Sequence, residues 1–537
     1  MIAGGDRLPD GFRIALDPAT RQVAGDLWFG GSPARVLRLT DRGRAAWAEL
    51  TRGPVASPVT GAVARRFTDA GLAHPVPPPV AGAPDVTVVI PVRDRAALLD
   101  GCLAGLGGGC PVVVVDDGSA DRLAVAAVAA AHGATLIRRP VNGGAAAARN
   151  TGLACVTSEL VAFVDSDCVP SPGWIDRLVG HFADPAVAAV APRVTALAPD
   201  SWAGRYLRAA GSLDLGDRPA RVVPGSRVAY VPTAALIARR AALEAVACQG
   251  EVFDSRLRIG EDVDLVWRLH RRGWRVRYDP SVRVGHREPE TWPGLLARRA
   301  RYGTSAAPLA VRHPRHVSHL VLRPGPALTV AALLARRPLL AAGAFALSAG
   351  SARRRLRAAG IPAGISTGPA GISTGPTSGA AAATAAAWLG IGQYATRFAA
   401  PALLALLVPG GRNRWARRVA AGSLLLGTPL VDWARRRPAL DPIRYTVAAL
   451  ADEIAYGIGV WAGCLAHRTT APLRPVLVRG KAASAEPHSG TRQRDTRPGS
   501  PPGRTRQGEL SPRGIPLRRP TTPGRVDPAT QKREIPS

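Results

Sequence analysis

Cysteine is scarce in this sequence, which holds only six in 537 residues. They are Cys102, Cys110, Cys155, Cys168, Cys248 and Cys464. No two of them form a CxxC pair, which argues against a thiolate zinc site. The low count favours a reduced, cytosolic compartment. The N-terminal segment MIAGGDRLPDGFRIALD also lacks an apolar stretch, so we expect no signal peptide.

Acidic residues are outnumbered, since 39 Asp and Glu stand against 70 Lys and Arg, for a formal net charge of +31. Such a charge suggests nucleic-acid binding, but its distribution does not. Residues 467–537 alone hold 15 basic and 5 acidic side chains, in a segment rich in Pro, Ser, Thr and Gly. We expect this tail to be disordered, and either solvated or in contact with an anionic membrane surface rather than a specific nucleic acid.

The length allows several domains. Residues 1–76 are predicted to form a hairpin, FRIALDPATRQVAGDLWFGG, with a turn at DPAT, and two short helices, as in a winged-helix module. The proline-rich residues 77–84 are a linker. Residues 325–466 are apolar and rich in alanine, but most of their hydrophobic runs are short or contain a charge. We expect helices that lie at a membrane surface, with spanning helices or a soluble bundle as alternatives.

Two further segments have no assigned role. The heptad AGISTGP occurs twice in tandem, over residues 363–376, and reads as a duplicated flexible loop. Two copies of such a heptad cannot build a repeat architecture. The basic tail, residues 467–537, is the other segment.

Strand and helix patterns alternate in residues 85–324. The apolar runs DVTVVIPV, PVVVVDDGS and LVAFVDSD are separated by helical runs such as RAALLDGCLAGL and GGAAAARNTGLACV. This rhythm predicts an α/β domain with a parallel sheet and helices on both faces. Ligands bind such sheets at the carboxyl ends of the strands. The acidic clusters of this chain stand at those ends.

The polar residues at the strand and helix ends form an ordered series. It consists of Pro91, Asp94, Asp116, Asp117, Gly144, Arg149, Asp165, Asp167, Glu261, Asp262 and His286. Asp165 and Asp167 could bind one Mg²⁺ or Mn²⁺ ion, to which His286 would add a nitrogen ligand. Arg149 could pair with a phosphate or a carboxylate. Asp262 begins a helical pattern and is a candidate general base. Alone, each pattern is more often a turn or a helix cap.

Taken together, PVRDR, DDGS, NGGAAAARNTG, DSD and EDVDL resemble the inverting family-two glycosyltransferases of GT-A fold over residues 85–290. The resemblance implies a nucleotide-sugar donor, a divalent metal and a single displacement with Asp262 as the base. The implied substrate-binding residues are Pro91, Asp94, Asp116, Asp117, Gly144, Arg149, Asp165 and Glu261. The implied metal ligands are Asp165, Asp167 and His286.

The flanking segments LPDGFRIALDPATRQVAGDLWFGG, RYGTSAAPLAVRHP and ADEIAYGIGVWAGC resemble the mycofactocin biosynthesis glycosyltransferases. This resemblance implies transfer of β-glucose from a UDP-sugar to a peptide-derived redox cofactor or its precursor. Residues 1–76 resemble the winged-helix peptide-recognition modules of such pathways, and the carrier peptide or protein of the pathway is the implied partner. Together with the apolar region, it places the protein at the cytoplasmic side of the cell membrane.

Two absent patterns bear on the alternatives. The processive-synthase signature QxxRW is missing, since RRARYG stands in its place, but a polysaccharide or glycolipid glycosyltransferase stays an alternative. A sugar nucleotidyltransferase would need a glycine-rich loop after the first strand, where no glycine occurs before Gly101.

A basic binding protein with an inactive domain is the alternative from another class, but it would not need carboxylates at successive strand ends. Salt-sensitive nucleic-acid binding without UDP-sugar binding would favour it.

Overall fold

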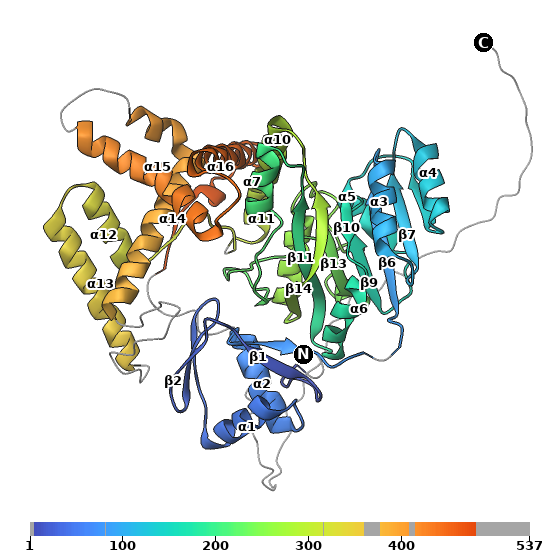
Figure 1. The fold of residues 1–537 in the computed structure, drawn as a ribbon, viewed down its shortest axis with the longest axis horizontal. Helices are drawn as coiled ribbons and strands as arrows, with labels where there is room; N and C mark the ends of the chain where they lie inside the picture. Colours follow the sequence, from blue (N-terminus) through green and yellow to red (C-terminus); the bar gives the residue numbers. More distant parts are fainter. Residues whose placement is uncertain (1–4, 81, 315, 359–375, 408–413, 479–537) are drawn as a thin grey trace, which may run out of the picture. The chain divides into compact units, whose positions relative to one another are not determined.

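The computed structural model describes residues 5–80, 82–314, 316–358, 376–407 and 414–478 (Figure 1). All of the tandem heptad except Pro376 lies outside the described residues, as does the basic tail beyond residue 478. The predictions made for these two segments therefore remain predictions.

The N-terminal module contains two small sheets and two helices. Its elements are β1 (Arg13–Leu16), β2 (Arg21–Ala24), β3 (Leu27–Gly30), β4 (Arg35–Arg38), α1 (Asp41–Arg52), α2 (Pro58–Ala70) and β5 (Ala73–Val76). The helices begin where the sequence supplies caps: Thr40 accepts from Gly43 N, and Ser57 forms a capping box with Thr60. Trp28, Trp47 and Phe67 pack together in the core.

The sequence predicted that β1 and β2 pair as a hairpin, and this prediction is wrong. β1 pairs antiparallel with β5, whereas β2 pairs with β3 in a separate three-stranded sheet. The turn between β1 and β2 explains the difference. The Asp17 carboxylate accepts from Ala19 N and binds His74 Nε2 at 2.9 Å, so it fastens the end of β1 to β5 while the chain leaves that sheet. Local alternation did not reveal this long-range partner.

The main sheet has nine strands in the order β10-β14-β11-β13-β9-β6-β7-β8, with β12 beside β14. They are β6 (Val86–Val92), β7 (Val112–Asp117), β8 (Thr135–Arg139), β9 (Leu160–Val164), β10 (Cys168–Pro170), β11 (Val187–Leu197), β12 (Ala220–Arg221), β13 (Ala235–Arg239) and β14 (Arg275–Arg287). The four strands β8, β7, β6 and β9 are parallel, as predicted. The rest is mixed, because β13 runs antiparallel to both β9 and β11.

Helices cover both faces of this sheet, as predicted. One face packs against α5 (Ala145–Leu153) and α9 (Glu261–Arg271), and the other against α3 (Ala96–Leu106), α4 (Arg122–Ala131) and α6 (Trp174–Val179). Alternation along the strands builds the two cores, since Val89 and Phe163 face the first layer while Val88 and Val164 face the second. Two short helices, α7 (Trp202–Ala210) and α8 (Arg240–Glu244), complete this part.

The C-terminal part of the described chain is helical. It comprises α10 (Trp292–Thr304), α11 (Ala306–Arg312), α12 (Pro324–Leu334), α13 (Pro338–Ala358), α14 (Pro376–Ala405), α15 (Arg414–Arg436) and α16 (Pro442–Ala466), with a short pairing of β15 (Val321–Leu322) and β16 (Val476–Leu477). α10 packs along α16 (Figure 1). Among the described helices, α16 alone is long and apolar enough to cross a membrane, and 44% of its apolar stretch is buried within the protein.

Candidate active site

The parallel strands bring the first acidic residues to one edge of the sheet. Pro91 and Asp94 lie at the end of β6, Asp116 and Asp117 end β7, and Asp165 directly follows β9. Because β7, β6 and β9 are parallel neighbours, their carboxyl ends meet at the same edge. The sequence prediction for this edge is thus met by the strand order.

Arginine side chains pair with both carboxylates of the DSD sequence. Arg149 of α5 donates to Asp165 Oδ1 at 2.6 Å and to Glu261 Oε1 at 2.6 Å. Arg95 binds Asp167 Oδ2 at 2.8 Å. The Arg149 side chain is 3% exposed, whereas that of Arg95 is 49% exposed. Arg149 therefore ties together α5, the end of β9 and the start of α9, while Arg95 forms a pair that solvent can open.

The adjacent pair Asp116 and Asp117 is bound by backbone amides and arginines. Asp117 accepts from Gly143 N at 2.9 Å and Gly144 N at 2.7 Å, where it caps α5, and Arg139 Nε donates to it at 2.8 Å. The fully buried Asp116 accepts from Ser119 N and pairs with Arg138. Sequence reasoning missed both arginines, although they end the next strand, β8.

Asp262 lies in the first turn of α9 and is only half-buried. Its Oδ1 accepts from Val263 N at 2.8 Å. Burial, together with the nearby charge of Glu261, raises the pKa of Asp262 to about 7. A carboxyl group with such a pKa is suited to accept a proton near neutral pH.

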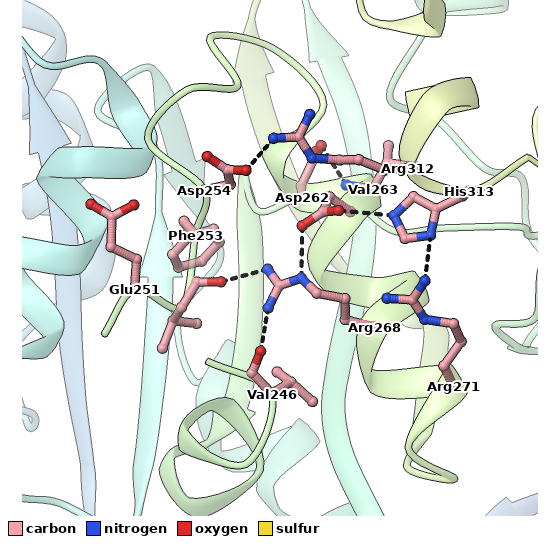
Figure 2. Close-up of polar contacts among 12 residues, drawn as sticks. Val246, Glu251, Phe253, Asp254, Asp262, Val263, Arg268, Arg271, Arg312 and His313 are labelled. Carbon is pink, nitrogen blue, oxygen red and sulfur yellow. Dashed lines mark hydrogen bonds and ion pairs between the residues drawn. The ribbon is translucent and has the colours of Figure 1, made fainter. Parts of the chain in front are cut away.

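A buried polar network connects α9 to the segments that pack against it (Figure 2). Asp264 accepts from Arg268 Nε at 2.7 Å and binds His313 Nε2 at 2.8 Å. Burial alone would raise the pKa of Asp264, but these two partners outweigh it and keep that pKa below its ordinary value. Arg268 also donates to the carbonyl oxygens of Val246 and Val252. Asp264 belongs to the EDVDL motif, but sequence reasoning missed its partners, although the spacing of Asp264 and Arg268 was a usable signal.

Strand pairing brings His286 beside the DSD sequence. β10 pairs antiparallel with β14, and Cys168 lies opposite His286. His286 Nε2 is 3.4 Å from Asp167 Oδ1, and its Nδ1 binds Glu288 Oε1 at 3.0 Å. A carboxylate on one ring nitrogen leaves the other free as a ligand, an arrangement common in metal sites. Among the described residues, however, no three His, Cys, Asp or Glu side chains are grouped closely enough to hold a metal ion, so the set of Asp165, Asp167 and His286 stays a prediction.

One cavity of about 420 Å³ collects many of these side chains. Five predicted residues line it: Arg149, Asp165, Glu261, Asp262 and His286. The other predicted residues, Pro91, Asp94, Asp116, Asp117, Gly144 and Asp167, are not in its lining.

Sequence reasoning missed several residues of this cavity. Tyr230, Tyr302 and Tyr456 line it, and each comes from a different part of the chain. The exposed Arg258 also lines it and lies close to Gly144, where a Cβ atom would be 2.9 Å from its Nη1. Among the described residues, no ion pair joins Arg258 to a carboxylate. Nothing in the local sequence marked Arg258 among the many arginines of the chain.

Comparison with known proteins gives the family. Residues 87–245 match the family model described as "Glycosyl transferase family 2". The chain is 38% identical over 481 residues to the pre-mycofactocin glycosyltransferase of Mycobacterium tuberculosis, covering 88% of this chain and 99% of that protein. It is also 32% identical over 223 residues to the succinoglycan biosynthesis protein ExoO of Rhizobium meliloti, which covers 38% of this chain and 61% of that protein.

The solved structures that resemble this chain include a mannosyltransferase from Pyrobaculum calidifontis in complex with GDP-Man and Mn²⁺. It is 21% identical, with a TM-score of 0.39, and covers 73% of this chain and 89% of that one. The mixed α/β sheet of the present chain is of the GT-A type that the sequence predicted. Because the identity extends over nearly the whole of a curated relative, the chain belongs to glycosyl transferase family 2 and is a glycosyltransferase close to the pre-mycofactocin enzyme.

Proposed function

We propose that this glycosyltransferase moves glucose, in β-linkage, from a UDP-sugar to the peptide-derived precursor of mycofactocin. The printed name of the relative from Mycobacterium tuberculosis supports the acceptor. The observation that carries the chemistry is Asp262, a carboxylate with a pKa of about 7 that lines the same cavity as Asp165 and Arg149. The N-terminal module would receive the carrier peptide or protein of the pathway.

The reaction would be one displacement at the anomeric carbon. The acceptor hydroxyl loses its proton to Asp262, and its oxygen forms a bond to that carbon as the bond to the diphosphate breaks. UDP leaves with the bonding electron pair. Attack opposite the leaving group inverts the configuration, and for this reason an α-linked donor would give a β-linked product.

The donor would occupy the strand ends. Asp94, Asp116 and Asp117 are proposed to contact the nucleotide, beside Pro91 of β6. Asp165 would bind the ribose and diphosphate. Arg258 faces Gly144 at the start of α5 and is suited to pair with the diphosphate, because no described carboxylate holds it. Arg149 and Glu261 would keep this edge in register through their ion pair.

A divalent cation, Mn²⁺ or Mg²⁺, would be the cofactor of this reaction. Asp167 and His286 would hold it, with Asp165 as the third ligand of the predicted set. When bound, the cation would neutralise the charge of the diphosphate leaving group. Arg95 would have to release Asp167, which its half-exposed position allows.

Asp167→Ala should abolish the metal dependence of donor binding, because it removes the ligand next to His286. We expect wild-type protein to bind UDP at least tenfold more tightly with Mn²⁺ than with EDTA, and the variant to show less than a twofold difference. Calorimetric titration of UDP and of UDP-glucose measures both. Arg95→Ala, which frees the same carboxylate, is the matched control and should retain the metal effect. Metal-dependent binding that survives in Asp167→Ala would rule out this ligand.

The C-terminal helices are proposed to lie on the cytoplasmic face of an anionic membrane. Leu339 and Leu340 of α13 are 87% and 65% exposed, beside Arg336 and Arg337. Exposed apolar side chains next to cations suit the interface of a bilayer with acidic lipids.

Sedimentation with vesicles tests this location. We expect the wild-type protein to bind phosphatidylglycerol vesicles more than phosphatidylcholine vesicles, and Leu339→Glu/Leu340→Glu to bind several-fold less. Leu123→Glu changes a side chain of α4 that is 75% exposed, and should bind like the wild type. Equal sedimentation of all three proteins would contradict the assignment of α13 to the membrane surface.

A further inference from the structure

Helix α16 reaches the active cavity, although its sequence suggested a membrane helix. Tyr456 of α16 lines the cavity together with Asp262 of α9. Tyr230, from the loop before β13, and Tyr302, from α10, line it as well. Three tyrosines that are distant in the sequence therefore surround the cavity that contains the candidate base.

The position of α16 is fixed by direct backbone contact with α10. A Cβ atom at Gly459 would lie 1.8 Å from the carbonyl oxygen of Ala300, and one at Gly303 would lie 2.2 Å from that of Tyr456. Both distances are too short for any side chain, so the two helices touch where glycine stands. Arg299 of α10 also pairs with Asp452 of α16 at 2.6 Å. An ion pair and a contact this close hold α16 as a wall of the cavity.

The ring of Tyr456 is in contact with two arginines. The guanidinium groups of Arg299 and Arg397 lie over its ring, 5.3 and 4.8 Å from the centroid. Both arginines are in turn paired with acidic residues of α16, Asp452 and Glu453. The charges of Arg299 and Arg397 are therefore used within the protein, and neither is a free cation beside Tyr456.

The phenol groups of the three tyrosines share two properties. Within the described part of the chain, none of their hydroxyls makes a hydrogen bond to another residue. Burial raises the pKa of each phenol, that of Tyr302 to about 12, so all three are uncharged at neutral pH. The charge of nearby Asp262 further raises the pKa of Tyr230. Half-buried hydroxyls without protein partners in a cavity are available to a ligand.

We propose that Tyr230, Tyr302 and Tyr456 form the acceptor-binding wall of the cavity and hydrogen-bond an uncharged acceptor that carries oxygen or nitrogen atoms. This inference rests on the proposed function, because it places the acceptor beside Asp262. It gives α16 a part in substrate specificity rather than in crossing a membrane. Of the arginines that line this cavity, Arg299 is paired with Asp452, and Arg258 is the one proposed above to pair with the diphosphate of the donor.

Calorimetric titration of pre-mycofactocin, without donor, tests the wall directly. Tyr456→Phe removes only the hydroxyl and keeps the ring between its arginines. We expect Kd for pre-mycofactocin to rise about fivefold in Tyr456→Phe, and more than tenfold when Tyr230→Phe is added. Tyr445→Phe is the matched control, because Tyr445 lies on the same helix but its hydroxyl binds Asp432 away from the cavity. Kd for the acceptor should not change in that variant.

Each result has a distinct meaning. Three results would contradict the proposal that these tyrosines bind the acceptor. They are an unchanged acceptor Kd in Tyr456→Phe, an equal rise in Tyr445→Phe, and no binding of pre-mycofactocin by the wild type. A separate titration with UDP-glucose and Mn²⁺ reports on the donor site, and we expect Tyr456→Phe to bind it like the wild type. Failure of the wild type to bind donor would contradict the proposed function, while the acceptor titration would still decide the wall.

Discussion

Replacing Asp262 with Asn should reduce kcat about 10³-fold while the Kd for UDP-glucose stays within twofold of the wild type. The asparagine has nearly the same shape but cannot accept the proton of the acceptor hydroxyl, and a positioned general base typically contributes 10²- to 10⁴-fold. The start of α9 should persist, because His313 binds Asp264 of this helix and Arg268 of the helix donates to the carbonyl oxygen of Val246 (Figure 2). Product formation, measured with UDP-glucose and pre-mycofactocin, gives kcat. A normal rate in this variant would show that another group takes the proton.

The pH dependence of the wild type provides the internal control for this experiment. The pKa of Asp262 is about 7, so the base is protonated and inactive below that pH. We therefore expect kcat/KM to rise about tenfold per pH unit up to pH 7 and to level off above it. The residual activity of Asp262→Asn should lack this rise. If both proteins show the same rise, the titrating group is not Asp262.

Replacing Arg149 with Leu should lower the free energy of unfolding by about 3–5 kcal/mol, because it leaves two carboxylates, Asp165 and Glu261, without their shared cation. Although burial by itself lowers the pKa of Arg149, those carboxylates raise it, so the guanidinium is charged in the folded protein. The same change should abolish sugar transfer, because it releases the end of β9 and the start of α9. Denaturant unfolding at pH 7.5 measures the first effect.

Arg95→Leu is the matched comparison for stability. It removes a cation from the neighbouring carboxylate, Asp167, but the Arg95 side chain is half-exposed. We expect a loss within about 1 kcal/mol, as for other exposed ion pairs. If Arg149→Leu and Arg95→Leu unfold at the same denaturant concentration, burial is not what makes the Arg149 cluster important.

The sequence predicted that the carboxyl ends of β6, β7 and β9 meet at one edge, because the signals for that edge are local. Apolar runs that end in Asp116 and Asp165 indicated strands, and parallel strands must bring those ends together. The start of α9 at Glu261 was visible as an acidic pair before a helical pattern. The sequence carried the α/β class, the helices on both faces and this edge because each needs only neighbouring residues and the rules of strand connection.

Features that depend on distant pairing were not predictable in the same way. The partner of β1 is β5 rather than the adjacent β2, and β13 enters the sheet antiparallel without a periodic signal of its own. His286 meets Asp167 only because β14 pairs with β10. Tyr456 was read as part of an apolar helix, and only the glycine contacts of α10 and α16 bring it to the cavity. No local pattern specifies such contacts.

The backbone contact between α10 and α16 joins two segments that the ribosome synthesises at different times. Every strand of the main sheet and Asp262 have been synthesised by Arg287, but Tyr456 follows far later in the chain. Domains fold in turn from the N-terminus during synthesis. A nascent chain can therefore complete the strand ends that carry Asp116 and Asp165 while one side of the cavity is still open to solvent. Only when α16 leaves the ribosome and packs against Ala300 does Tyr456 close this side of the cavity.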